Sequence, residues 1–132
     1  MTINLPKLIG HRGVKDLAPE NTLQSINQAI ELNIKWVEID VKISKDQIPF
    51  LLHDSSLERT TSGNGSPLTY KYSELYKLDA GSWFDTKYKD LPFENRGFFK
   101  WTPNAMYVFA IGIPFAFAVA TGSQSMFVVA IY

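Results

Sequence analysis

The chain has 132 residues, enough for one small domain, and its 13 basic side chains equal its 13 acidic ones. Without a basic excess it is not expected to bind nucleic acid, and without cysteine it has neither a disulfide framework nor a thiolate nucleophile. Residues 1–7 lack the apolar core of a signal peptide, so we expect a cytoplasmic protein. Every charged side chain precedes Trp101, and this break in composition sets 102–132 apart from the rest.

The first predicted strand covers Lys7–His11, with Leu8 and Ile9 buried. It runs into the triplet His11-Arg12-Gly13. The histidine can move a proton near neutral pH, the arginine offers a planar fork to an anion such as phosphate, and the glycine permits a tight turn. Such a triplet is common by chance, so its interpretation depends on the residues that follow.

A helix is predicted over Thr22–Leu32, where apolar residues recur at helical spacing. Asn21 or Thr22 can cap its start, and Asn33 is expected to end it. The next segment, Trp36–Ile43, alternates with the period of a strand. This strand-helix-strand order predicts a βαβ unit with parallel strands.

Within the second strand, Glu38 and Asp40 lie two residues apart, so their carboxylates project from the same face. Side by side they repel unless a cation lies between them, and hard oxygen ligands favour Mg²⁺ or Ca²⁺ over zinc. The alternative is a solvated face on which Lys42 pairs with the two acids.

The segment Ile48–Asp54 is expected to return as a hairpin arm, because the preceding connection is too short for a crossover helix. A turn at Asp46 and Gln47 would place Asp40 opposite His53, although this register could slip by one or two residues. His53 and Asp54 could also form an ordinary turn-facing pair. The two histidines and the two strand carboxylates are expected to converge at one end of the strands.

The remaining polar part of the chain contains mainly loops. Residues 59–67 have loop composition, and 79–84 form a turn with aromatic anchors. Between them a short helix is predicted over Ser73–Leu78, capped by Ser73, with Leu75 and Leu78 pointing inward.

Five motifs follow one another along this part of the chain. They are His11-Arg12-Gly13, Pro19-Glu20-Asn21-Thr22, Glu38-Ile39-Asp40-Val41, His53-Asp54 with Leu57 and Arg59-Thr60-Thr61, and Leu78-Asp79-Ala80-Gly81-Ser82-Trp83-Phe84. In order and spacing they resemble the motifs of the glycerophosphodiester phosphodiesterase family. The resemblance covers about residues 8–93.

The resemblance implies an α/β fold, a (β/α)₈ TIM barrel, of which this chain holds only the first strands and helices. It also implies a divalent cation, Ca²⁺ or Mg²⁺, and hydrolysis of small glycerophosphodiesters to an alcohol and glycerol 3-phosphate in lipid metabolism. His11 and His53 would be the acid/base pair, and Arg12 would contact the phosphate. The metal ligands would be Glu38 and Asp40, with Glu20 as a supporting acid.

The chain departs from the family in its length and its last third. A complete barrel needs about 250 residues. The family's third metal-binding acid comes from a later strand, in a Glu-x-Lys pattern, but no Asp or Glu follows Glu94 here. We therefore divide the chain into a truncated family domain, 1–93, and a divergent apolar tail, 94–132, and we expect impaired hydrolysis.

The tail contains an uncharged stretch, 105–122, that is just long enough for a transmembrane helix. Arg96 and Lys100 precede it and would keep the N-terminal part on the cytoplasmic side. The alternative is a tail that is no membrane segment, for example one produced by a change of reading frame. The sequence leaves both open.

The main prediction is therefore a metal-dependent phosphodiester hydrolase. Two other functions fit the same sequence. One is a non-catalytic fragment that keeps the motifs without the complete site, and the other is an accessory protein anchored in a membrane through 105–122.

Overall fold

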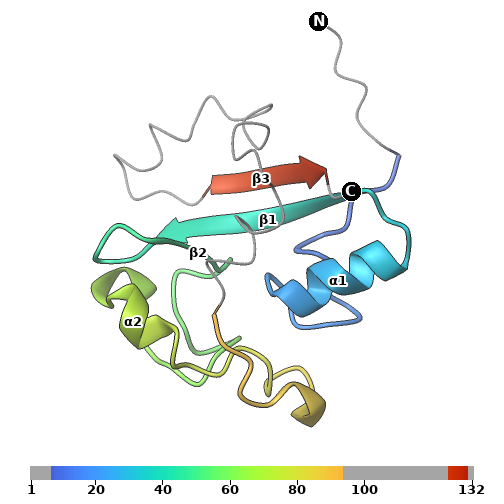
Figure 1. Ribbon diagram of the computed structural model, residues 1–132. Coiled ribbons are helices and arrows are strands. Elements are labelled where there is room, and N and C mark those ends of the chain that lie inside the picture. Colours follow the sequence, from blue (N-terminus) through green and yellow to red (C-terminus); the bar gives the residue numbers. More distant parts are fainter. Residues whose placement is uncertain (1–6, 94–124, 131–132) are drawn as a thin grey trace, which may run out of the picture.

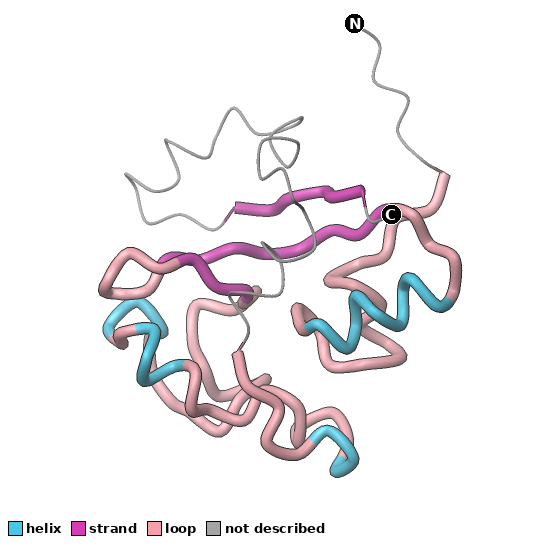
Figure 2. The backbone as a smooth tube through the Cα atoms, in the orientation of Figure 1, coloured by secondary structure: helices cyan, strands magenta, loops and turns pink. Residues whose placement is uncertain are grey.

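The computed structural model describes residues 7–93 and 125–130. In chain order its elements are α1 (Leu23–Glu31), β1 (Trp36–Ile43), β2 (Pro49–Leu51), the 3₁₀ turn η1 (Pro67–Thr69), α2 (Tyr72–Leu75), the 3₁₀ turn η2 (Thr86–Tyr88) and β3 (Ser125–Ala130). Figures 1 and 2 show β1 as the long strand at the centre, with loops making up much of the remaining backbone.

A three-stranded antiparallel sheet, in the order β2-β1-β3, organises these elements. Val41 of β1 pairs with Leu51 of β2 on one edge and with Ser125 of β3 on the other. A single parallel bridge joins Gly10 to Val37. The predicted parallel pairing around α1 is therefore present, but it is limited to this bridge.

Helix α1 forms as predicted, from its cap to its end. The Thr22 side chain accepts a hydrogen bond from the Ser25 amide, and Asn33 adopts a left-handed backbone with φ of 58° directly after the last turn. The apolar stripe of α1 packs through Ala29 against the buried Val37 and Ile39 of β1. The sequence pattern was sufficient here because capping, spacing and the stop signal agree.

A second apolar cluster forms where the long loops meet β2. Its buried members are Phe50, Leu52, Leu57, Leu75 and Phe93. The rings of Phe50 and Phe93 meet edge to face, with 6.0 Å between centroids, a favourable arrangement for aromatic pairs. Leu51 belongs to the first cluster and Phe50 to the second, because successive side chains of a strand point to opposite faces.

The predicted strand Lys7–His11 was wrong in extent. Only Gly10 is paired, and Leu8, predicted to be buried, is 64% exposed. Leu8 precedes the paired residue, so no hydrogen bond holds this part of the backbone against β1. Within 125–130 the tail forms a strand, β3, along the edge of β1 opposite to β2.

The hairpin register was wrong by one residue. Ser44 donates its amide proton to the Ile48 carbonyl at 3.0 Å, and the Ser44 hydroxyl accepts from the Ile48 amide. Gln47 has a positive φ of 63° in this turn. The five-residue turn places Leu52, rather than His53, opposite Asp40, with the Leu52 amide donating to the Asp40 carbonyl at 3.0 Å.

The short helix α2 also begins earlier than predicted, at Tyr72 rather than Ser73, and ends at Leu75. The Glu74 carboxylate accepts a hydrogen bond from the Lys71 amide at 2.8 Å, so the acidic residue fixes the start. Leu75 is fully buried, as predicted.

The predicted transmembrane segment, 105–122, lies outside the described residues. Within the ranges that are described, no helix has the length and apolar character needed to cross a bilayer.

Candidate active site

The site begins with a tight turn after Gly10. Two hydrogen bonds fix Gly10 against β1, from its amide to the Trp36 carbonyl at 2.8 Å and from the Glu38 amide to its carbonyl at 2.7 Å. Gly13 has φ of 83°, and an added Cβ there would lie 2.2 Å from the Ser25 hydroxyl oxygen. Glycine at position 13 therefore lets the turn lie against α1, with Arg12 above β1.

The two predicted metal ligands are buried side by side on β1. Glu38 is 7% exposed and Asp40 4% exposed, so the alternative of a solvated face was wrong. Glu38 accepts a hydrogen bond from the Arg12 amide at 3.0 Å. Asp40 is paired with the Asn21 side chain, which donates to its carboxylate at 3.0 Å and accepts from its amide at 3.1 Å.

The negative charge of Glu38 is only partly compensated. Burial raises the pKa of Glu38 above its usual value and the neighbouring charge of Asp40 raises it further, while the Arg12 amide and the charges of His11 and Arg12 oppose the change. A buried acid whose raised pKa comes from desolvation and a second carboxylate is a candidate for a functional group. A bound cation would offset the cost of burying these two negative charges side by side.

Arg12, the predicted phosphate contact, lies among three acids in this structure: its amide binds Glu38, and its guanidinium reaches Glu20 and Asp40. Its Nη1 donates to Glu20 at 3.0 Å, and its Nε lies 3.4 Å from the Asp40 carboxylate. Glu20 also accepts two hydrogen bonds from Arg59, at 2.7 and 3.0 Å. Burial tends to raise the pKa of Glu20, but Arg59 and Arg12 together outweigh burial and lower it.

The second histidine is held by its neighbour. Nδ1 of His53 lies 2.7 Å from Oδ1 of Asp54. Asp54 also accepts hydrogen bonds from Arg59 at 2.5 and 2.9 Å. These Arg59 hydrogen bonds, with help from His53 and against partial burial, lower the pKa of Asp54 to about 2.

The first histidine lies at the other end of this network. Nε2 of His11 is 3.8 Å from the Glu38 carboxylate, and the His11 side chain is 56% exposed. A continuous series of polar contacts therefore runs from His11 through the two strand acids and the two arginines to His53. All six predicted site residues belong to it: His11, Arg12, Glu20, Glu38, Asp40 and His53.

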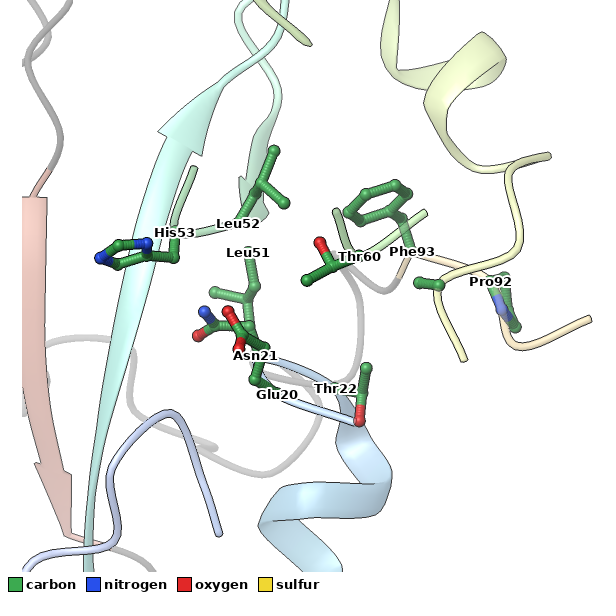
Figure 3. Close-up of a pocket in the computed structure, with 10 residues that line it drawn as sticks. Glu20, Asn21, Thr22, Leu51, Leu52, His53, Thr60, Pro92 and Phe93 are labelled. Atoms are coloured by element: carbon green, nitrogen blue, oxygen red, sulfur yellow. The ribbon is translucent and has the colours of Figure 1, made fainter. Parts of the chain in front are cut away.

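A pocket lies beside this network, between the loop before α1 and the end of β2. Glu20, Asn21, Leu51, His53 and Thr60 contribute to its lining. In Figure 3 the imidazole of His53 points away from Phe93, whereas Glu20 and Asn21 lie below Leu51. The pocket has a polar side formed by the acid-bearing loop and an apolar side formed by the second cluster.

Three residues of the network were not assigned site roles from the sequence. Asn21 was interpreted only as a helix cap, but it binds Asp40 and has a left-handed φ of 56°. Asp54 was given only as part of a motif and as the possible turn partner of His53, and Arg59 only as part of a motif. The spacing of five residues between Asp54 and Arg59 could have indicated this pair, because a short loop can bring the two side chains together. The sequence alone does not show which acid the arginine binds.

The fit of a divalent cation can be judged from the donor set. Glu38 and Asp40 offer two hard carboxylate groups side by side in a buried position, and burial raises the pKa of Glu38, a donor set that suits Mg²⁺ or Ca²⁺. The part of the chain that the structure describes contains no group of three or more His, Asp or Glu side chains arranged for a metal. The two carboxylates thus fit part of a coordination shell.

This arrangement is typical of a hydrolytic site that uses acid/base groups. It combines two buried acids and two histidines with the turn that follows the parallel bridge. Comparisons with known proteins agree. The model of the glycerophosphoryl diester phosphodiesterase family matches residues 11–118. The Bacillus subtilis protein YhdW is 42% identical over 77 residues, which cover 58% of this chain and 32% of YhdW. The human glycerophosphoinositol inositolphosphodiesterase GDPD2 is 42% identical over 87 residues, covering 60% of this chain and 16% of GDPD2.

Solved structures give the same result. A phosphodiesterase from Oleispira antarctica, in complex with the product sn-glycerol-3-phosphate, has a TM-score of 0.65 and 48% identity, covering 67% of this chain and 37% of that one. A glycerophosphodiester phosphodiesterase from Agrobacterium tumefaciens has a TM-score of 0.65 and 37% identity, covering 68% and 39%. These neighbours imply a TIM-barrel-like fold, of which the described residues form a part.

The chain belongs to the glycerophosphoryl diester phosphodiesterase family, because the family model matches well over half of it. It spans about a third of the length of YhdW and less than two fifths of either solved structure.

Proposed function

We propose that this chain supplies the acid/base and metal-binding half of a site that hydrolyses glycerophosphodiesters to an alcohol and glycerol 3-phosphate. The observation that supports this most directly is the pair of buried carboxylates, Glu38 with its raised pKa and Asp40 beside it, linked by polar contacts to both histidines. The bound product in the Oleispira antarctica relative supports the same substrate class.

His11 and His53 are the proposed proton-transfer pair. One histidine can accept a proton from water, while the second donates a proton to the leaving alcohol. Asp54 holds His53 through Nδ1, which leaves Nε2 to face the reaction. Nε2 of His11 lies 3.8 Å from the Glu38 carboxylate, beside the proposed metal ligands.

Glu38 and Asp40 are the proposed ligands of a divalent cation, Ca²⁺ or Mg²⁺, with the remaining ligands supplied by substrate, water or residues beyond the described ones. When bound, such an ion supplies a positive charge that stabilises the negative charge developing on the phosphate. Arg12 is the proposed phosphate contact, although its guanidinium binds Glu20 and approaches Asp40 in this structure. We infer that an anionic substrate competes with these carboxylates for Arg12.

The test uses the 132-residue chain and a rejoined barrel, in which residues 1–93 are fused to the rest of the barrel of the Oleispira antarctica relative. Release of glycerol 3-phosphate from glycerophosphocholine is measured with Mg²⁺, with Ca²⁺ and with chelator. We expect activity near background for the chain and metal-dependent hydrolysis for the rejoined barrel. His11→Ala or His53→Ala should lower that hydrolysis by about 10²–10⁴-fold.

Gln28→Ala on the surface of α1 is the control and should leave the rate unchanged. A rejoined barrel that hydrolyses the substrate equally well without either histidine would overturn the proposal. So would a correctly folded rejoined barrel without metal-dependent activity, which would favour the non-catalytic alternative.

A further inference from the structure

Arg59 belongs to the network, but the proposed function does not use it. Its guanidinium donates four hydrogen bonds to two acids. Nε and Nη2 bind the two oxygens of Asp54 at 2.5 and 2.9 Å, while Nη1 and Nη2 bind the two oxygens of Glu20 at 3.0 and 2.7 Å. Two bidentate pairs on one guanidinium fix its plane and its rotation, which a lysine ammonium cannot do.

A third element holds the same guanidinium. Cζ of Arg59 lies 5.9 Å from the centroid of the Trp83 ring, within the range of a cation–π contact. Trp83 is itself anchored, because its indole N–H donates to the Ala80 carbonyl at 3.0 Å. Arg59 therefore joins the loop before α1, the end of the hairpin and the aromatic turn around one charged group.

The consequence reaches His53 through Asp54. An ionised carboxylate is only an acceptor, so its 2.7 Å contact with Nδ1 of His53 requires the proton to be on Nδ1. In the neutral ring Nε2 then carries the lone pair. Arg59 keeps Asp54 ionised, since its hydrogen bonds hold the pKa of that carboxyl at about 2, and it keeps Oδ1 in place for His53.

We propose that Arg59 is a positioning residue that acts through Asp54 to hold the neutral His53 ring in the tautomer with the proton on Nδ1. Glu20 and Trp83 fix Arg59 from two other segments, so the geometry of Asp54 does not depend on its own loop alone. The importance of this tautomer for hydrolysis rests on the proposed function of His53, but the tautomer itself does not.

The experiment is ¹⁵N NMR of the histidine side chains in the full chain, at a pH where both rings are neutral. The chain has two histidines, so His11 serves as an internal reference. We expect His53 to carry its proton mainly on Nδ1. Arg59→Gln and Asp54→Asn should each shift His53 towards the tautomer mixture of a free histidine, and Arg59→Lys should give an intermediate shift.

Lys15→Gln removes a surface cation that pairs with Asp16 and should change nothing. Backbone amide spectra show whether each variant is folded, and Arg59→Lys keeps the test decisive if Arg59→Gln unfolds. The proposal is overturned if folded Arg59→Gln or Arg59→Lys leaves the His53 tautomer as in the wild type, or if the wild type carries the proton on Nε2.

The two proposals fail in distinguishable ways. In one outcome, Arg59→Gln shifts the His53 proton away from Nδ1 and the rejoined barrel hydrolyses the substrate without His53. This outcome would overturn the proposed function, whereas the positioning role of Arg59 would stand. An unchanged tautomer with His53-dependent hydrolysis would do the reverse.

Discussion

Glu38 and Asp79 are two carboxylates in opposite situations. Asp79 is surrounded by local donors: its Oδ1 accepts from the amides of Gly81 at 2.8 Å and Ser82 at 3.0 Å, and its Oδ2 accepts from the Asp90 amide at 3.1 Å and from the Ser82 hydroxyl. Burial tends to raise the pKa of Asp79, but these hydrogen bonds outweigh it and hold the pKa well below the usual range. Glu38 has one amide donor, from Arg12, and a raised pKa.

The difference separates an acid held by its own loop from the proposed metal ligand. Asp79 organises the turn 79–84 and the segment that returns at Asp90. The backbone amides of these segments stabilise its charge. Glu38 is buried beside Asp40 with less compensation than its charge requires. Such a group is tolerated where a ligand completes the site, so the comparison points to β1, and not to the turn, as the place of chemistry.

The largest expected effect concerns hydrolysis. In the rejoined barrel, Glu38→Gln should lower the metal-dependent rate by at least about 10²-fold, because a neutral amide is a much weaker ligand for a hard cation. Asp79→Asn should leave the rate within about threefold, since Asp79 does not contact the network. The assay is release of glycerol 3-phosphate at saturating metal. Equal losses in the two variants would contradict the distinction.

The second effect concerns stability, and here the change at Asp79 should have the larger effect. Asp79→Ala should lower the free energy of unfolding by about 1–3 kcal/mol, because several backbone amides lose their acceptor. Glu38→Gln should leave it unchanged or raise it by less than about 1 kcal/mol, since burial of a charged group is relieved. Urea denaturation measures both, with Asp16→Asn as a surface control. A large destabilisation by Glu38→Gln would show that its charge is already compensated.

The sequence predicted those parts of the fold in which local signals agree. Helix α1 combines a cap, an apolar stripe and a left-handed stop, and β1 shows strict alternation with the bounds that are found, Trp36–Ile43. The hairpin register depends on a positive φ at Gln47 and on a turn closed by Ser44, which the alternation of β2 does not specify. Register therefore failed by one residue.

For the site, residue types and spacing singled out acids and histidines that lie in one polar network in the structure, but they did not predict the partners of these residues. Asn21 and Arg59 join segments that are far apart in the chain, and the distances from Arg59 to Glu20 and from Asn21 to Asp40 arise only after folding. The contact of Arg12 with phosphate stays a prediction. In this structure the anions it contacts are carboxylates.

A third prediction uses the pH dependence of stability. The pKa of Asp54 is about 2 in the folded chain, below its usual value of 3.8. A lowered folded-state pKa stabilises the fold above the unfolded value, and this contribution is lost as the pH falls from about 4 to about 2. Arg59→Gln removes the main cause and should flatten the stability curve in this window. Thermal unfolding between pH 2 and 5 checks this, and an unchanged slope would contradict it.

The smallest expected effect is metal binding by the chain itself. Glu38 and Asp40 provide two ligands, whereas Ca²⁺ prefers six to eight oxygens, so we expect weak binding of Ca²⁺ or Mg²⁺ by calorimetry. A weakly bound ion also gives only a small rise in melting temperature, because stabilisation grows with the logarithm of ligand concentration over Kd. Glu38→Gln should abolish the binding signal, and Asp79→Asn should not.

Tight binding would indicate a further ligand, and Glu20 is the acid to test first. Both of its oxygens are occupied, one by Arg12 and Arg59 and the other by Arg59. For Glu20 to bind a metal, at least one of these arginine contacts must break. Glu20→Gln should therefore leave weak binding unchanged if Glu20 only supports the arginines, and should weaken it strongly if Glu20 completes the shell. The same titration thus decides whether Glu20 resembles Asp79, held by its donors, or Glu38, available to a cation.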